Sequence, residues 1–168
     1  MALIPPRQQV TRKFPIVGER EPLPEAVDMR RWRLTVTGAV ARPQTWTYEA
    51  FVRLPQVEAQ HDIHCVTRWS RLGCRWQGVA FSTLAALVQP LPEARFVQSV
   101  AYSPRQHDAS LPLEVCLKED VLLAWAMDAQ PLSVAHGYPL RVVAPSRYFY
   151  KSVKWVHEVR FLHEDVLG

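Results

Sequence analysis

The chain has 168 residues, of which 48% are hydrophobic and 21% charged, so it is long enough for one domain with a real core and too short for a multidomain redox enzyme. Its net charge of +4 comes from Lys and Arg scattered among Asp and Glu, which does not indicate nucleic-acid binding, although a buried anionic ligand would explain the excess. Three cysteines are too few for a disulfide framework, and no apolar segment approaches the roughly 20 residues that a membrane span needs.

The N-terminal segment is expected to be an extended arm. Residues 1–28 are rich in proline and show no sustained periodicity, so they are predicted to wrap a single domain formed by residues 29–168, the first ten being the loosest. The first residues carry no basic stretch followed by a long apolar run, and no twin arginine precedes one, so a cytoplasmic protein is expected.

The first half of the chain contains two alternating segments separated by a short helix. Residues 32–38 alternate and end at a glycine, which predicts a strand, and residues 40–44 form a loop. Thr47 is placed to cap a helix over 48–54, which Pro55 ends. The next segment predicts a strand, one face of which carries Val57, Ala59, His61, Ile63 and Cys65.

The second half is interpreted from the same signals. Residues 69–77 are expected to form a loop whose two tryptophans wall a flat ring system or fill the core, and Ser82 is expected to cap a helix through Val88. A turn is predicted at 103–108 and a short helix or turn at 111–118. Strands are predicted at 95–102, 140–144, 152–161 and 120–127, the last alternatively a buried helical turn. Alternation over 152–161 places Trp155 and Val159 on one face and Val156 on the other. The fold class is therefore α+β, with β-rich mixed sheets and short helices.

The sulfur of Cys65 is the candidate for the reactive atom. A cysteine binds a soft metal as the thiolate, and the nearby Arg68, His61 and His64 would lower its pKa and favour that form. The alternative is a small hydrophobic residue on an apolar strand face, which is the expected role of Cys74 and Cys116.

Two separated blocks add a family resemblance. The first is HCVTRWS at residues 64–70 followed by WQGV at 76–79, and the second is HGYPLR at 136–141 followed by Pro145 and YFYKSVKWV at 148–156. In this order they resemble the molybdopterin-dependent sulfite oxidase family, from about Phe14 to the C-terminus.

The resemblance implies the sulfite oxidase molybdopterin-binding-domain fold, a molybdopterin cofactor with molybdenum, and Cys65 as the protein's ligand to the metal. Arg141 and Lys154 are the leading candidates for holding the pterin phosphate, because guanidinium and ammonium groups suit it, and Gly137 would let the chain approach the cofactor closely. Arg141→Ala is expected to lose the cofactor with the fold intact. The remaining cofactor-binding candidates are His64, His136, Ser152 and Val153, with Arg147 and Lys151 as secondary ones.

Two further arginines are candidates for the reaction itself. In the resembled family an N-terminal arginine reaches the substrate pocket, and Arg12 is the position that lines up with it. Arg68 would steer an oxyanion or offset charge on the metal centre, or would simply be a surface arginine that bridges to Asp62.

The implied reaction is transfer of an oxygen atom and two electrons on a small oxyanion or a sulfoxide. The chain ends at Gly168, before the substrate tyrosine of sulfite oxidases, and lacks their haem and dimerisation domains, so sulfite itself is in doubt. A separate haem protein or another electron acceptor or donor is the expected partner.

Three other interpretations stay open. A zinc site from His61, His64, Cys65 and Cys74 has suitable ligands, but alternation of the strand points His64 away from His61 and Cys65. A domain that binds the pterin cofactor or a protein partner without turnover is the second, and a purely structural module is the third.

Overall fold

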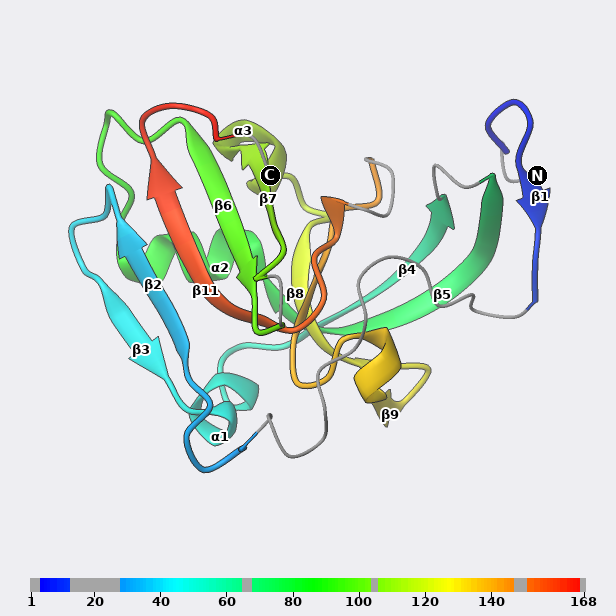
Figure 1. Ribbon diagram of the computed structural model, residues 1–168, viewed down its shortest axis with the longest axis horizontal. Helices are drawn as coiled ribbons and strands as arrows, with labels where there is room; N and C mark the ends of the chain where they lie inside the picture. Colours follow the sequence, from blue (N-terminus) through cyan, green and yellow to red (C-terminus); the bar gives the residue numbers. More distant parts are fainter. Residues whose placement is uncertain (1–3, 13–27, 65–67, 104–105, 147–150, 167–168) are drawn as a thin grey trace.

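The computed structural model describes residues 4–12, 28–64, 68–103, 106–146 and 151–166, with only the backbone of His64 and Trp69. In this part the chain forms two β-sheets joined by short helices (Figure 1). The predicted α+β, β-rich class is confirmed.

The first sheet has five strands and is mixed. Its order is β3-β2-β11-β6-β7; β11 pairs with β2 in parallel, and the other pairs are antiparallel. The strands are β2 (Leu34–Gly38), β3 (Gln44–Trp46), β6 (Phe96–Ala101), β7 (Asp108–Pro112) and β11 (Val156–Leu162).

The second sheet has six strands and is built on β5 (Trp69–Ala80). β4 (Val57–His64) lies antiparallel along one edge of β5, while β1 (Gln9–Val10) and β8 (Leu122–Met127) share the other. β10 (Arg141–Val143) and the two-residue β9 (Gln130–Pro131) pair with β8. Figure 1 shows the β4–β5 hairpin extending away from the five-stranded sheet, with β1 at its far end.

The helices are short. In α1 (Tyr48–Val52), Thr47 accepts a hydrogen bond from the Ala50 N–H at 3.1 Å, as predicted for its cap. The others are α2 (Phe81–Val88), α3 (Leu113–Cys116) and the 3-10 turn η2 (Val134–His136), and none of the described helices is long and apolar enough to cross a membrane.

Two hydrophobic clusters form the core. The larger packs α2 against the five-stranded sheet and includes Leu34, Phe81, Leu84 and Phe161. The smaller lies under the six-stranded sheet and consists of Ile63, Cys74, Trp76, Leu122, Ala124, Leu132 and Val143.

Most predicted strands are confirmed within a few residues, and residues 120–127 adopt the strand alternative. The loop predicted at 69–77 is wrong, because this segment is most of β5. Its backbone groups bond to strands on both edges, and buried Cys74 and Trp76 alternate with exposed Arg75. The strand β7 was missed, and α2 begins after Ala80 rather than at a Ser82 cap.

The predicted alternation over 152–161 is also partly wrong. The strand begins only at Val156, and its register with β6 shifts between Val156 and Glu158. Val156 is therefore fully buried, although the pattern had placed it on the face opposite Trp155 and Val159.

The N-terminal arm is partly described. Gln9 and Val10 pair in parallel with the start of β5, so the arm is attached within its first ten residues, which were expected to be the loosest. Residues 13–27 lie outside the described part, and the domain boundary near residue 28 stays a prediction.

Candidate functional site

Three segments of the second sequence block meet at the side chain of Arg141. This residue starts β10 and is only 1% exposed. Its Nη1 donates to the carbonyl oxygen of His136 at 2.9 Å, and its Nη2 donates to that of Ser152 at 3.0 Å. Arg141 therefore ties η2 and the 151–155 segment to the edge of the six-stranded sheet.

Gly137 permits this meeting. Its φ of +120° disfavours residues with a side chain, and an added Cβ would lie 2.9 Å from Arg141 Cβ and 3.4 Å from Lys154 Cβ. In the described structure Gly137 is thus in close approach to two cationic side chains, and its close approach to the cofactor stays a prediction.

Lys154 is the second leading candidate and is half-buried. Its Nζ donates to the Ala135 carbonyl oxygen at 3.2 Å and lies 4.5 Å from the ring centroid of Trp155. Arg141 and Lys154 therefore both bond to carbonyls of η2, which directly precedes Gly137.

Ser152 and Val153 fasten the same segment to β10. Ser152 Oγ accepts a hydrogen bond from the Ala144 N–H at 3.1 Å, and the Val153 carbonyl accepts one from the Val142 N–H at 2.9 Å. Both side chains are buried. In the described structure they hold the chain in place beside Lys154.

His136 lies in a strongly positive environment. Burial, followed by the charges of Arg141, Lys154 and Arg71, lowers the pKa of His136 to about 4. The imidazole is therefore neutral at pH 7, and the surrounding cations favour an anion.

Arg71 was missed by the sequence interpretation, because it was assigned to a loop. It lies on β5 with a side chain 21% exposed, its Nη2 3.1 Å from Asp128 Oδ2 and its Nη1 3.8 Å from Met127 Sδ. Its position just after the HCVTRWS block was the one available signal.

The two blocks meet through Trp76 and Arg141. The Arg141 guanidinium carbon lies 5.3 Å from the ring centroid of Trp76, which belongs to the WQGV motif. Burial raises the pKa of Cys74 to about 11 and that of Cys116 to about 12. Both thiols are buried and neutral, as expected of structural cysteines.

The segment that contains Cys65 is described only at its borders. Cys65, Arg147 and the side chain of His64 lie outside the described residues. Arg68 is exposed, with a left-handed backbone at φ 70°, where β5 is about to begin. Its proposed partner Asp62 accepts a hydrogen bond from the Gly73 N–H at 2.9 Å.

The N-terminal arm runs beside the start of β5. The Gln9 N–H donates to the Arg68 carbonyl at 2.9 Å, and the Thr11 N–H donates to that of Ser70 at 2.8 Å. Arg12 follows directly and is exposed. In this parallel register Gln9 lies opposite Trp69 and Val10 opposite Ser70, so Arg12 lies further along β5 than Arg68. The catalytic roles of both arginines stay predictions.

Lys151 points to a different place. It is half-buried, and its Nζ donates to the Ser110 carbonyl of β7 at 3.2 Å. This contact is with the five-stranded sheet.

The zinc alternative finds no support in the described residues, where no three His, Cys, Asp or Glu side chains are grouped to hold a metal. His61 and Cys74 do face each other across β4 and β5. The other two ligands of that interpretation, His64 and Cys65, lie outside the described side chains.

Comparison with known proteins decides the family. The family model described as "Oxidoreductase molybdopterin binding domain" matches residues 20–168. The chain belongs to this family. As a member it is a molybdopterin-dependent oxidoreductase with a molybdenum cofactor, and the resemblance to sulfite oxidases is confirmed.

Relatives in the molybdopterin oxidoreductase family differ in length. The chain is 39% identical to "Uncharacterized oxidoreductase YuiH" of Bacillus subtilis over 98% of its own residues and 82% of that protein. It is 30% identical to "Putative protein-methionine-sulfoxide reductase subunit YedZ1" of Azospira oryzae, covering 93% of this chain and 59% of the relative. It is 26% identical to "Protein-methionine-sulfoxide reductase catalytic subunit MsrP" of Ralstonia nicotianae, with coverages of 80% and 44%. The chain thus spans only about half of the length of the last two.

A solved structure supports the fold. The sulfane dehydrogenase SoxCD from Paracoccus pantotrophus superposes with a TM-score of 0.75 at 23% identity, over 82% of this chain and 40% of that one. The described residues also fit the cofactor chemically, because the positive charges of Arg71, Arg141 and Lys154 near a neutral His136 suit an anionic phosphate.

Proposed function

We propose that this molybdopterin oxidoreductase transfers an oxygen atom and two electrons on a sulfoxide, or on a small oxyanion, with Cys65 as the thiolate ligand of the metal. The observation that carries the proposal is the cluster of Arg71, Arg141 and Lys154 around the neutral His136, next to Gly137. The relatives named protein-methionine-sulfoxide reductases support a sulfoxide as the substrate class.

In this proposal the second sequence block, which begins at His136, binds the cofactor. Lys154 meets the phosphate as a half-buried ammonium, and Arg71 adds positive charge from β5. Arg141 donates hydrogen bonds to the carbonyls of His136 and Ser152, and its buried positive charge attracts the phosphate through space. The neutral imidazole of His136 supplies one hydrogen-bond donor or acceptor.

In this proposal the substrate binds near the N-terminal arm and the segment that contains Cys65. The oxygen of a sulfoxide or oxyanion accepts hydrogen bonds, and Arg12 and Arg68 are exposed guanidinium donors on the arm and before β5. When bound, molybdenum supplies two-electron chemistry by cycling between its VI and IV states. One sulfoxide, two electrons and two protons give one thioether and one water, and the electrons come from a separate haem protein or another one-electron carrier.

The test compares two cysteine variants of protein expressed in a host that makes the cofactor. Wild type should hold about one molybdenum per chain and reduce dimethyl sulfoxide with a reduced viologen dye. Cys65→Ser should lose turnover by more than about 100-fold, because the metal loses its thiolate. Cys74→Ser, which changes a buried neutral thiol, should keep it.

Two results would contradict the proposal. Full turnover by Cys65→Ser removes that residue as the ligand. Wild-type protein that carries molybdenum and pterin but turns over neither sulfoxide nor sulfite would favour the alternative, a domain that binds the cofactor without catalysis. A cytoplasmic location is part of the proposal, and cell fractionation checks it.

A further inference from the structure

Residues 28–33, called here the arginine turn, display three cations on a rigid backbone. The N–H groups of Arg31 and Trp32 each donate to the Asp28 carbonyl at 2.9 Å, and the Arg30 N–H donates to Asp28 Oδ1 at 3.0 Å. Arg33 Nη1 donates to the carbonyls of Arg30 and Trp32 at 3.0 and 2.7 Å. The turn is therefore preorganised without help from a partner.

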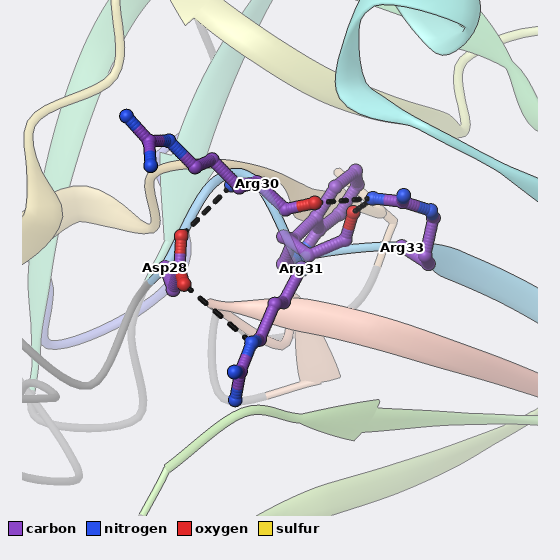
Figure 2. Close-up of polar contacts among 5 residues, drawn as sticks. Asp28, Arg30, Arg31 and Arg33 are labelled. Carbon is purple, nitrogen blue, oxygen red and sulfur yellow. Dashed lines mark hydrogen bonds and ion pairs between the residues drawn. The ribbon is translucent and has the colours of Figure 1, made fainter.

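The charge of the arginine turn faces solvent. Arg30, Arg31 and Arg33 are exposed, and the Arg31 side chain is 90% exposed although it lies 3.8 Å from Asp28. Figure 2 shows Arg30 and Arg31 extending in different directions from the turn, while Arg33 folds back over it. Three positive charges thus stand against one carboxylate, so the basic residues are less evenly scattered than the composition suggested.

A chain of aromatic rings leads from this turn to the cofactor block. Trp32 is buried, and its ring centroid lies 6.2 Å from that of Tyr48 on α1. Tyr48 in turn lies 6.0 Å from Tyr138, which follows Gly137 and packs against the smaller hydrophobic cluster. Figure 1 shows the start of β2, where the turn ends, beside α1.

We propose that the arginine turn is the docking surface for an acidic one-electron carrier protein, and that Trp32, Tyr48 and Tyr138 connect this surface to the cofactor block. The inference rests on the proposed function, because only a redox reaction needs such a carrier. Exposed guanidinium groups on a hydrogen-bonded turn attract a carboxylate-rich partner and raise its association rate. Rings in van der Waals contact narrow the gaps across which an electron must pass.

The electrons balance with two encounters for each turnover. A reduced haem or flavin protein gives up one electron at each encounter and is oxidised by one unit. Two such electrons with two protons from solvent convert one sulfoxide into one thioether and one water. The aromatic rings are neither oxidised nor reduced overall, and burial raises the pKa of Tyr48 to about 12, which keeps its hydroxyl protonated.

The first experiment reverses charge on the turn of the cofactor-loaded protein. The probe is a fully reduced flavodoxin, a small acidic flavoprotein, with dimethyl sulfoxide as the acceptor. Arg30→Glu/Arg31→Glu should slow flavodoxin oxidation at low ionic strength by about 10-fold or more and weaken flavodoxin binding measured by calorimetry. The difference should shrink to about 2-fold in ~0.5 M salt, where screening is short-ranged.

The matched control is Arg42→Glu/Arg95→Glu, which makes the same change in net charge at two exposed loop arginines, one before β3 and one before β6. This control should behave like wild type within about 2-fold. Turnover driven by a reduced viologen dye should be unchanged in both variants, since the dye needs no docking.

The second experiment addresses the rings. Tyr48→Phe keeps the contacts with Trp32 and Tyr138 and should keep the flavodoxin-driven rate, whereas Tyr48→Leu should lower it about 5-fold or more. Dye-driven turnover reports any damage to the site itself.

Several results would overturn the inference. One is equal flavodoxin rates and affinities in the turn and control variants, and another is a wild type that the dye reduces but flavodoxin does not. Loss of duplex-DNA retention, without loss of flavodoxin oxidation, would assign the turn to another polyanion. Absence of dye-driven turnover in wild type identifies failure of the proposed function instead.

Discussion

The two sheets of the molecule do different work. The five-stranded sheet packs against α2 through a large hydrocarbon cluster, which is suited to hold the fold together. The six-stranded sheet contributes Val79, Leu123 and Val142 to that cluster, and it also carries a second, much smaller cluster. A buried guanidinium and a half-buried imidazole lie on its β10 side. Charge and polar groups are costly to bury, so they collect where little hydrocarbon must pack around them.

The largest expected effect is a loss of stability at a residue of the larger hydrophobic cluster. Phe81 is 1% exposed, and its ring centroid lies 5.9 Å from that of Phe161. Phe81→Ala should lower the free energy of unfolding of the apo protein by about 3–5 kcal/mol, because it leaves a cavity. Urea denaturation measures this, with exposed Leu117→Ala as the control. A loss below about 1 kcal/mol in the free energy of unfolding would contradict the assignment of stability to the larger hydrophobic cluster.

The next effect is at the guanidinium that ties the site together. Arg141→Met keeps most of the volume but leaves the carbonyls of His136 and Ser152 without these donors. We expect a loss of about 2–4 kcal/mol in unfolding free energy as well as loss of cofactor. The expectation that an Arg141 variant spares the fold is therefore revised. Exposed Arg95→Met should cost little, and an equally stable Arg141→Met would restore the earlier expectation.

A smaller change in stability is expected at Lys154, which is assigned to binding the phosphate and not to stabilising the fold. Lys154→Met loses one bond to the Ala135 carbonyl and a cation–π contact, so it should cost about 1 kcal/mol or less. Molybdenum and pterin contents after purification should nevertheless fall about 10-fold. Lys118→Met, at an exposed lysine, is the matched control. Unchanged cofactor content in Lys154→Met would end its assignment to the phosphate.

The smallest effect concerns pH. The pKa of His136 is about 4 in the folded chain and about 6.5 when unfolded, so the unfolded chain binds more protons between these values. Stability from the neutral imidazole is therefore present above about pH 6.5 and is lost as the pH falls toward 4. Because the site is half-buried and partly screened, His136→Gln should remove only about 1 kcal/mol of the decline between pH 7 and pH 5.

Chemical denaturation of the apo protein at both pH values measures this difference. Exposed His163→Gln should follow wild type. An identical pH dependence in His136→Gln would show that the cations around His136 do not act on it in solution.

Local signals predicted much of the fold. The Thr47 cap, the strand over 57–64 and the glycine-ended strand at 34–38 were found because each depends on nearby residues. The site was predicted only as far as family motifs reach. Those motifs indicated Arg141, Lys154 and Gly137, and they missed Arg71, because the pattern did not distinguish a paired strand from a loop.

By itself the sequence determined the family, the fold class and the cofactor, since these depend on residue identities and on their order along the chain. Only the tertiary structure decided that Arg141 is buried and bonds to η2, that the charge of Arg71 on β5 acts on His136, and that Trp32 meets Tyr48. The reason is that burial and through-space charge depend on which distant strands pair and pack together, and no local pattern specifies that pairing.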